Sequence, residues 1–280
     1  MRKKLLVTSA LIFFVSAGIL FYLYSQNQSK TFSVTFLNIG QGDAVLIKFG
    51  NGEKMLVDCG PNKIILSELG KNLPFWDRKI DYVLTTHPDL DHYGGCIDVV
   101  KRYRVKKIIT NGQTKPNDPY WKEWNKISQA SGAKLILING PTVWNIGGSQ
   151  LTFFSPDDEL YLDVKNTDNN NFSIVFKLIA PSGKTFLFTG DMEIPLEQAL
   201  LEKYCQNSTC PLQANILKIG HHGSDTATGE TFLGAVNPDV AVISVGKNKF
   251  GHPSLRVIKH LERAGTKIWR TDMIGDIIVK

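Results

Sequence analysis

The stretch TTHPDLDHYGG, residues 85–95, places two histidines and two aspartates directly after an apolar run that is typical of a buried strand. The polar side chains stand at positions i, i+2, i+4 and i+5, and they are His87, Asp89, Asp91 and His92. A strand that ends in a tight loop can point all four side chains into one pocket. Neutral imidazole nitrogen and carboxylate oxygen are ordinary protein ligands of Zn²⁺, Mn²⁺ and Fe²⁺. A merely solvated loop would not explain why these residues end a buried strand, so the stretch predicts a metal site.

The segments around this stretch predict a protein with two sheets. Residues 32–36 alternate apolar and polar side chains, and Asn51-Gly52 joins two strand-like runs into a hairpin. Strands come in meanders at the start of each half of the chain, and strand–loop–helix units come at the end of each half. This order favours an α/β (α+β) four-layer αββα sandwich, with two mixed sheets face to face and the chemistry on loops at one end of the strands. Helices are expected near residues 62–71, 193–204, 228–236 and 253–264, followed by a final hairpin.

The first 30 residues are interpreted as a segment separate from the domain of residues 31–280. Basic residues at positions 2–4 precede an uncharged run, residues 5–24, and about 20 apolar residues are enough to span a bilayer. The basic flank would stay in the cytoplasm, so the domain would lie outside the membrane. The Val-Ser-Ala sequence at residues 15–17 offers a signal-peptidase site, and cleavage there would secrete the domain. Because the apolar run continues past that site, a single-pass anchor is the preferred interpretation.

The charge of the chain says little about nucleic acid. The formal net charge is +6, but four of the 32 basic residues and none of the 26 acidic residues lie in the first 30 positions. Residues 31–280 therefore carry a formal net charge of only +2. Such a near-neutral domain gives no electrostatic signature of nucleic-acid binding.

The four cysteines fit an exported chain only loosely. Cys205 and Cys210 bracket a short polar loop, where a local disulfide is one possibility outside the cell. Cys59 ends an apolar run and Cys96 follows a Gly-Gly pair, so both are interpreted as small buried residues rather than metal ligands.

The opening stretch resembles a known family when it is taken with seven other motifs of the chain. THPDLDH is similar to the His-x-His-x-Asp-His motif of the metallo-β-lactamase superfamily. FTGD, ending at Asp191, looks like that family's metal-bridging aspartate, and LKIGHHGS at 217–224 looks like its last metal-ligand motif. The ordered set resembles more narrowly the hydrolase domain of ComEC-type DNA-uptake (competence) proteins, over about residues 32–280. The remaining motifs are LNIGQGDAVLI (37–47), VDCG (57–60), NNNFSIVF (169–176), VISVGKNKFGHPS (242–254) and RTDMIGDI (270–277).

The resemblance implies a centre with two divalent metal ions. One ion would be held by His87, Asp89 and Asp191. Asp191 would bridge to the second ion, which one histidine of a neighbouring pair would also bind. The strand before that pair ends at Gly220, which slightly favours the first histidine of the pair. The ligands of the second ion would be Asp91, His92, Asp191 and either His221 or His222.

The chain departs from the superfamily pattern at two points. Asp89 stands where most members have a histidine, and no histidine lies between His92 and His221. An oxygen from Asp168, Asn169, Asn170 or Asn171 could fill the missing position, or the segment could be a polar loop. A carboxylate in place of imidazole moves metal preference from Zn²⁺ toward Mn²⁺ or Mg²⁺. We therefore expect two divalent ions, zinc or manganese.

Five further residues are expected around the metal ligands. Asp58 would accept a hydrogen bond from a metal-bound histidine. Asp43 would sit at the rim, where capping a turn is preferred over positioning a ligand. His252 opens the last long helix with Asn248 and Ser254 nearby, an arrangement that suits an anion such as phosphate. A plain capping loop is the alternative for this segment.

The resemblance implies a metal-dependent hydrolase that acts on a phosphodiester, with DNA outside the membrane as the preferred substrate. The metals would lower the pKa of a water, which Asp91 or Asp191 would orient, and His252 would steady the developing charge. The alternatives are a cell-envelope phosphodiesterase or esterase with a small substrate, and a non-catalytic nucleic-acid-binding module. The sequence contains no nucleophile elbow, P-loop or dinucleotide fingerprint, and no protein partner can be inferred from it.

Overall fold

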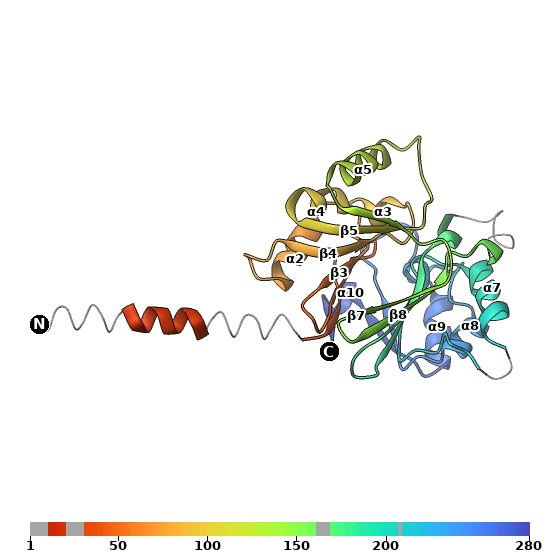
Figure 1. Cartoon of the computed structure of the whole chain (residues 1–280). Coiled ribbons are helices and arrows are strands. Elements are labelled where there is room, and N and C mark those ends of the chain that lie inside the picture. The colour runs from red at the N-terminus through yellow and green to blue at the C-terminus, as the bar shows by residue number, and fades with distance from the viewer. Residues whose placement is uncertain (1–10, 21–30, 161–168, 207–208) are drawn as a thin grey trace, which may run out of the picture.

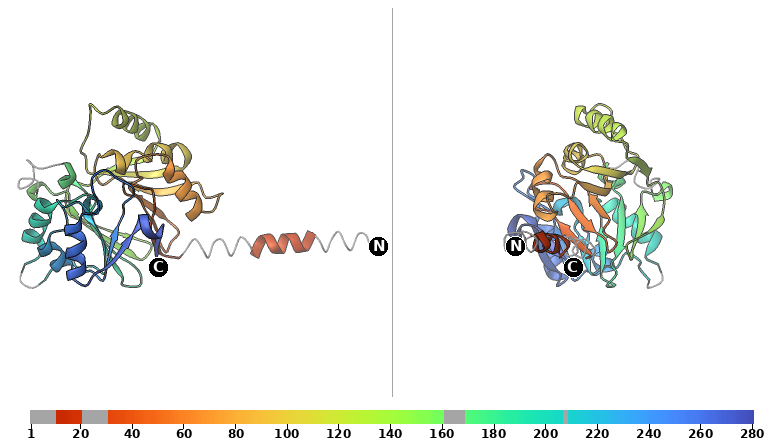
Figure 2. Two further views of the ribbon diagram at one scale, coloured as in Figure 1. Left: turned by 180° about the vertical axis from the view of Figure 1, so that it is seen from behind. Right: turned by 60° about the vertical axis from the view of Figure 1, so that its left-hand side comes forward.

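The structure is a computed structural model that describes residues 11–20, 31–160, 169–206 and 209–280. Among these residues, two seven-stranded sheets stack face to face (Figure 1, Figure 2). The first sheet runs in the order β14 (Ile277–Val279), β1 (Ser33–Phe36), β2 (Val45–Lys48), β3 (Lys54–Val57), β4 (Lys79–Leu84), β5 (Arg104–Thr110) and β6 (Lys134–Leu137). The second sheet runs in the order β13 (Lys267–Arg270), β12 (Val240–Ile243), β11 (Ile216–Lys218), β10 (Thr185–Phe188), β9 (Val175–Ile179), β8 (Ser149–Ser155) and β7 (Thr142–Ile146).

Helices cover the outer faces of both sheets, which confirms the predicted four-layer sandwich (Figure 1). Three separate apolar cores hold the layers together, one between the two sheets and one under each helical layer. Apolar burial between layers is the dominant favourable contribution to such a fold. The first sheet carries α2 (Ile64–Asn72), α4 (Cys96–Arg102) and α5 (Pro119–Ala130), and the second carries α7 (Ile194–Tyr204), α8 (Glu230–Val236) and α9 (Leu255–Arg263). The short elements are α3 (Leu90–Tyr93), α10 (Thr271–Ile274), η1 (Asn169–Phe172) and η2 (Gly220–Gly223).

The predicted hairpin at Asn51-Gly52 is confirmed, but the predicted final hairpin is wrong. β2 and β3 pair antiparallel across the Asn-Gly turn. β13 instead pairs parallel with β12 in the second sheet, and β14 pairs antiparallel with β1 in the first. The short helix α10 separates the two strands, and Ile277 and Val279 are buried in the core between the sheets. The last strands therefore tie the two sheets together.

The parallel parts of both sheets place their carboxyl ends at one edge of the sandwich. β3, β4, β5 and β6 are parallel neighbours in the first sheet, and β10, β11, β12 and β13 are parallel neighbours in the second. Loops that follow β3, β4, β10, β11 and β12 consequently meet at this edge. Functional residues usually stand on such loops while the sheets hold them rigidly.

The structure pairs all four cysteines. Cys205 and Cys210 form the local disulfide that the sequence allows. Cys59 and Cys96 are fully buried, as expected, but they also form a disulfide that the sequence analysis did not anticipate. The two residues are 37 positions apart, and only the packing of α4 beside the end of β3 brings them together.

Part of the predicted N-terminal apolar segment lies among the described residues. Residues 11–20 are helical and exposed, while residues 5–10 and 21–24 lie outside the described part of the chain. Among the described residues, none of the helices combines the length and apolar character needed to cross a bilayer. Membrane attachment stays a prediction from sequence.

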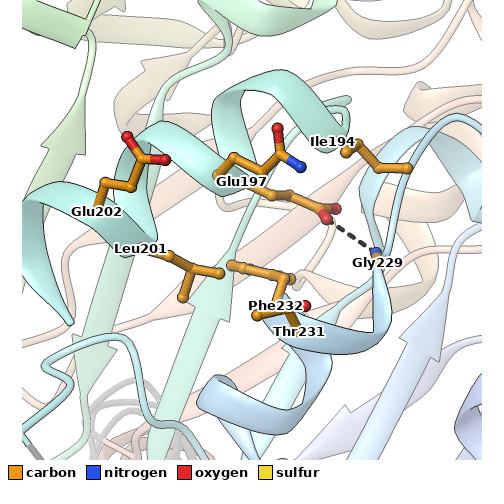
Figure 3. A pocket seen from close by; sticks show the side chains of 8 residues that line it. Ile194, Glu197, Leu201, Glu202, Gly229, Thr231 and Phe232 are labelled. Carbon is orange, nitrogen blue, oxygen red and sulfur yellow. Dashed lines mark hydrogen bonds between the residues drawn. The ribbon is translucent and has the colours of Figure 1, made fainter.

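A surface pocket of about 210 Å³ lies between α7 and α8 (Figure 3). Glu197 on α7 is almost fully buried at this pocket, and its two carboxylate oxygens accept hydrogen bonds from the backbone N–H groups of Thr228 and Gly229. Burial raises the pKa of Glu197 to about 7, although these hydrogen bonds oppose the shift. Glu197 thereby fastens the loop that precedes α8 to α7.

Candidate metal centre

The two histidines that follow β4, His87 and His92, are fixed by hydrogen bonds on one side of each ring. His92 stands on α3, and its Nδ1 donates to Asp58 Oδ2 at 2.9 Å. Asp58 also accepts from the backbone N–H and the hydroxyl of Thr86, each at 2.8 Å. The Nδ1 atom of His87 lies 3.1 Å from Thr86 Oγ1 and 3.4 Å from Ser173 Oγ. Both Nε2 atoms are buried without a hydrogen-bond partner among the described residues, so both rings present a free nitrogen to the same space.

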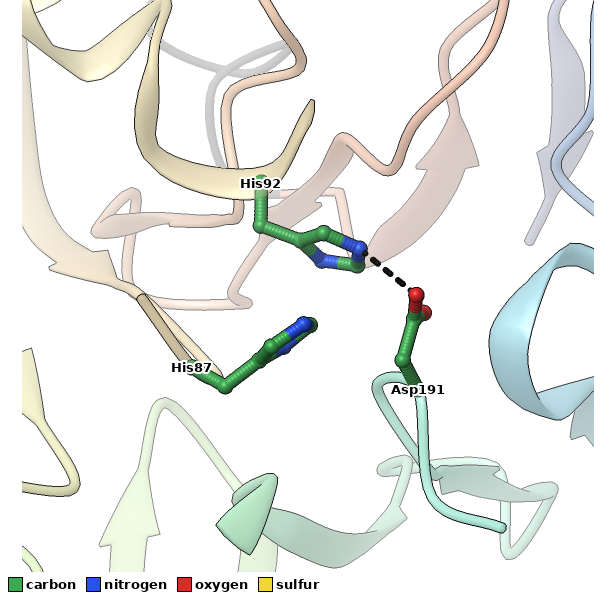
Figure 4. Close-up of side chains that lie close together, drawn as sticks. All are labelled: His87, His92 and Asp191. Carbon is green, nitrogen blue, oxygen red and sulfur yellow. Dashed lines mark ion pairs between the residues drawn. The ribbon is translucent and has the colours of Figure 1, made fainter. Parts of the chain in front are cut away.

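Asp191 approaches that space from the second sheet, directly after β10 (Figure 4). Its Oδ2 lies 3.2 Å from His92 Nε2, and His87 completes a buried group of three possible ligand atoms. The backbone N–H of Asp191 donates to Ser173 Oγ at 3.0 Å, which fixes the start of the loop. Asp191 Oδ1 is buried without a hydrogen-bond partner among the described residues. These atoms, which lack hydrogen-bond partners among the described residues, are suited to bind a metal ion.

His222, rather than His221, faces the centre. His222 is fully buried, and its Nε2 lies 3.3 Å from Asp91 Oδ2 and 3.4 Å from Asp191 Oδ2. Its Nδ1 donates to the carbonyl oxygen of Ser244 at 2.9 Å. His221 Nε2 is 4.0 Å from Asp191 Oδ2, and its side chain keeps 25% of its surface exposed. The geometry therefore favours His222 where the sequence slightly favoured His221.

The backbone at this histidine pair explains the arrangement. His221 has φ 45° and His222 has φ 52°, so two consecutive non-glycine residues adopt the left-handed region. Such conformations are costly for ordinary residues and concentrate at functional sites. The turn sends the two rings in different directions, a feature that spacing along the sequence cannot reveal.

The two aspartates of the opening stretch take different roles. Asp91 joins His92 and His222 in a second group of possible ligand atoms. Asp89 instead pairs with Lys115, and its Oδ2 stays 3.9 Å from His87 Nε2. Asp89 belongs to none of the ligand groups found among the described residues. Asp89, the carboxylate that suggested a harder metal, is thus paired with a lysine. The remaining donors are imidazole nitrogens and carboxylate oxygens, a set that suits Zn²⁺ as well as Mn²⁺.

Asp43 is buried, not at the rim as the sequence predicted, because it forms an ion pair with the buried Lys218. Lys218 on β11 is only 2% exposed, pairs with Asp43, and lies 3.6 Å from Asp191 Oδ1. Its Nζ also donates to the carbonyl oxygen of Gly190 at 2.8 Å. Asp43 Oδ1 is 3.5 Å from His222 Nδ1, so Asp43 supports that ring as well as the turn. A buried lysine in an apolar strand carries no recognisable sequence signal, and the sequence analysis missed it.

The charges of the cluster depend on one another. Burial alone would raise the pKa of Asp191, but His222 and His92 outweigh burial and hold that pKa well below its usual range. Burial alone would lower the pKa of His92 and of His222, but neighbouring carboxylates, Asp191 first, hold both well above the usual range. His87 differs, because burial and the nearby His92 lower its pKa. The carboxylates therefore require buried positive charge, which divalent cations can supply in place of protons.

The residues fit a divalent metal centre. The group of His87, His92 and Asp191 and the group of Asp91, His92 and His222 each place their ligand atoms within 4.8 Å of one another. The Nε2 atoms of all three histidines have no hydrogen-bond partner in the described part of the chain and point into this one region. Each ring is oriented through its other nitrogen, which is the usual arrangement around histidine ligands of metals.

The segment that could replace the missing histidine has another role. Asp168 lies outside the described residues. Asn171 accepts hydrogen bonds from the backbone N–H groups of Glu193 and Leu196, so it supports the start of α7. The Asn170 amide lies 3.3 Å from His221 Nδ1 and 3.4 Å from Glu193 Oε1, and Asn169 stands beside it in η1.

Glu193 is a site residue that the sequence analysis missed. Its Oε1 accepts from His221 Nδ1 at 3.0 Å and from the hydroxyl of Thr226. This contact turns the Nε2 atom of His221 toward Asp191. Burial alone would lower the pKa of His221, but the hydrogen bond to Glu193 and the charges of Asp191 and Glu193 together raise it. A carboxylate two residues after the FTGD motif was the available signal.

Two of the three predicted substrate-binding residues form hydrogen bonds within their own segment of the chain. Asn248 Oδ1 accepts from the backbone N–H groups of Phe250 and His252, and its Nδ2 donates to the carbonyl oxygens of Gly246 and His252. Ser254 Oγ accepts from Val257 N as the N-cap of α9. The capping alternative therefore describes these two residues. His252 does face the site, with its ring centroid 5.3 Å from that of His221.

The chain is similar to several known proteins. Residues 37–169 match the family model described as the metallo-beta-lactamase superfamily. ComE operon protein 3 of Bacillus subtilis (strain 168) is 30% identical over 267 residues, which cover 87% of this chain and 32% of that protein. Competence protein ComA of Neisseria gonorrhoeae is 31% identical over 261 residues, which cover 92% of this chain and 34% of that protein.

Both relatives are longer proteins, and the chain spans about one third of their length. Among solved structures, the diiron β-hydroxylase CmlA from Streptomyces venezuelae superimposes with a TM-score of 0.56. The sequence identity is 13%, and the match covers 90% of this chain and 54% of the other. At that identity the match concerns the fold alone.

Proposed function

The chain carries a metallo-β-lactamase domain of the metal-dependent hydrolase class and is related to competence proteins, and on this premise we propose that it cleaves phosphodiesters, DNA in particular, outside the membrane. The observation that carries the proposal is the convergence of three imidazole nitrogens with two carboxylates that come from separate sheets. Paired divalent ions, when bound at such a site, lower the pKa of a water and clamp the oxygens of a phosphodiester.

The chain's own residues would hold and orient the reacting groups. Asp91 is 35% exposed, so its carboxylate can accept a hydrogen bond from a water beside the substrate and orient that water. His221 would donate a hydrogen bond from Nε2 to a phosphate oxygen, because Glu193 fixes its other nitrogen. His252 lies next to His221 and would add a second donor to the developing charge.

The relatives support DNA as the substrate class. One of them is named a competence protein, and the similarity to it covers 92% of this chain. The location outside the membrane rests on the predicted anchor or signal peptide in the first 30 residues. Protease accessibility of residues 31–280 in intact cells tests that location, and protection of the domain would contradict it.

Metal content and nuclease activity of the full chain test the proposed reaction. We expect bound divalent metal, cleavage of DNA with Mn²⁺ or Zn²⁺, and loss of about 100-fold in rate for Asp91→Asn, as for misplacement of a reacting group. His260→Gln is the matched control, because His260 pairs with Glu230 on the helical layer. Full activity of Asp91→Asn would contradict the mechanism. Cleavage of bis-p-nitrophenyl phosphate without cleavage of DNA would replace DNA by a small substrate.

A further inference from the structure

We propose that Phe250 is a stacking platform for an unpaired nucleobase, which makes single-stranded nucleic acid the preferred ligand of this site. The inference rests on the phosphodiesterase function proposed above and extends it to how the strand is held. Phe250 belongs to the loop that leads from β12 to α9, and 63% of its surface is exposed. The side chain was not among the residues expected from the sequence.

A row of three rings connects Phe250 to the metal centre. The Phe250 and His252 rings are stacked, with centroids 5.6 Å apart and an interplanar angle of 29°. The His252 ring meets that of His221 edge to face at 5.3 Å, and His221 Nε2 lies 4.0 Å from Asp191 Oδ2. The exposed Phe250 ring therefore stands at the end of this row away from the metal ligands, where a strand that extends from the centre can contact it. The His252 Nδ1 atom is buried without a hydrogen-bond partner among the described residues.

The loop that carries Phe250 is rigid. Asn248 makes four hydrogen bonds within the loop, one of which is accepted from the backbone N–H of Phe250 at 3.0 Å. At the base of the loop, a side chain on Gly246 would come within 2.4 Å of the Gly40 backbone, so this segment packs closely against Gly40 and Gln41. An aromatic ring held in place before binding loses little entropy when a ligand stacks on it. The loop therefore presents the ring as a preformed surface.

Two lysines lie on the same loop as the exposed ring. Lys247 and Lys249 are both exposed on the same loop, and Lys249 Nζ lies 5.5 Å from the Phe250 ring centroid. Proteins that bind single strands combine basic side chains, which follow the phosphates, with aromatic side chains on which bases stack. The pairing of cations with one flat ring fits a nucleotide better than an uncharged apolar ligand.

The platform requires an unpaired strand. In a duplex each base is already stacked on its neighbours, whereas a single strand can turn a base face toward a protein ring. Exposed aromatic residues are common on their own, so position is what distinguishes Phe250. Phe75, for example, is 78% exposed but precedes β4, at the opposite end of that strand from His87.

The test compares two oligonucleotides of about 12 nucleotides, a length within the range that single-strand binding sites cover. One strand carries all its bases, and the other is a stable abasic analogue with the same phosphates. Binding to the full chain is measured by fluorescence anisotropy in EDTA, and cleavage is measured separately with Mn²⁺. We expect the wild type to bind the strand with bases about tenfold more tightly, in line with the loss of one stacked base. Phe250→Ala should remove this preference, and Phe250→Trp should keep it.

Phe75→Ala is the matched control and should bind both strands as the wild type does. If the wild type cleaves both strands and shows no preference for bases, the platform is refuted while the phosphodiesterase function stands. Base-dependent binding that Phe250→Ala abolishes, without any cleavage, supports the platform and refutes the proposed hydrolysis. If Phe250→Ala weakens only binding to phosphatidylglycerol vesicles, the ring contacts membrane and the inference is overturned.

Discussion

The two sheets contribute to the metal centre in different ways. The first sheet supplies His87, Asp91 and His92 from one continuous loop and helix after β4. The second sheet supplies Asp191 and His222 from separate loops after β10 and β11. One half of the site is therefore local in sequence, and the other half exists only once the second sheet has formed. The fold brings Asp191 and His222, which are distant in sequence, next to the ligands that follow β4.

The supports of the two halves differ as well. The first half is held by a carboxylate at the end of β3, Asp58, and by the buried disulfide between Cys59 and Cys96. The second half depends on charged side chains, with Lys218 beside Asp191 and Glu193 on His221. We expect changes in the first half to act mainly through stability and ring orientation. Changes in the second half should depend more strongly on charge.

Removal of one histidine ligand from each half is the strongest test of this comparison. His92→Ala and His222→Ala should each weaken metal binding by roughly 100- to 1000-fold, since about 10–16 kcal/mol is shared among the ligands of a typical zinc site. Equal losses of metal affinity would mean that His92 and His222 contribute equally to metal binding. Metal titration followed by calorimetry measures them, and His221→Ala should keep most of the affinity. A greater loss for His221→Ala than for His222→Ala would reverse the assignment.

The disulfides offer a second contrast, in stability. Loss of the Cys59–Cys96 bridge through Cys96→Ser should cost about 4 kcal/mol, and loss of the Cys205–Cys210 bridge through Cys210→Ser about 2 kcal/mol, from loops of 37 and 5 residues. The chain-entropy model predicts the larger loss for the longer loop. Denaturant unfolding of both variants measures the difference. A larger loss at Cys210 would show that the support of the first half lies elsewhere.

The sequence predicted the local half of the site better than the other half. His87, Asp91 and His92 could be identified because one loop carries them and their spacing is visible. The choice between His221 and His222 could not be made, because it depends on two left-handed backbone conformations. Asp89 could not be placed either, since its partner Lys115 lies 26 residues away.

The fold was predictable for a similar reason. The hairpin at Asn51-Gly52 and the alternation of strands with helices are local signals, and both agree with the structure. The last two strands look like a hairpin in sequence because each is short and apolar. Which sheet each joins depends on distant partners, β12 for one and β1 for the other.

Asp58→Asn tests how the first half orients its ring. Asparagine can keep the hydrogen bond from Thr86 but cannot replace both carboxylate oxygens, so the His92 Nδ1–H loses its acceptor. Loss of such a supporting carboxylate typically weakens metal affinity by about 10- to 100-fold. The effect should therefore be smaller than that of His92→Ala. If Asp58→Asn bound metal as the wild type does, Asp58 would serve the turn rather than the histidine.

Glu197→Gln gives the smallest expected effect, and it tests the dependence of the second half on charge. The pKa of Glu197 is raised from 4.5 to about 7 in the folded chain, so the folded state holds this proton more tightly than the unfolded state does. Stability should therefore fall as the pH rises from about 4.5 to about 7, and this decrease should be absent in Glu197→Gln.

Urea unfolding at pH 5 and pH 8 measures that difference. A loss of stability from the changed hydrogen bonds that is equal at both pH values does not alter the change of stability with pH. Glu202→Gln is the matched control, because Glu202 lines the same pocket but is exposed (Figure 3). We expect its pH dependence to equal that of the wild type. If the stability of Glu197→Gln still decreased fully between pH 5 and pH 8, the titration of Glu197 would not be its cause. The loop before α8 would then be held by its hydrogen bonds alone, and the second half would be less sensitive to charge than we expect.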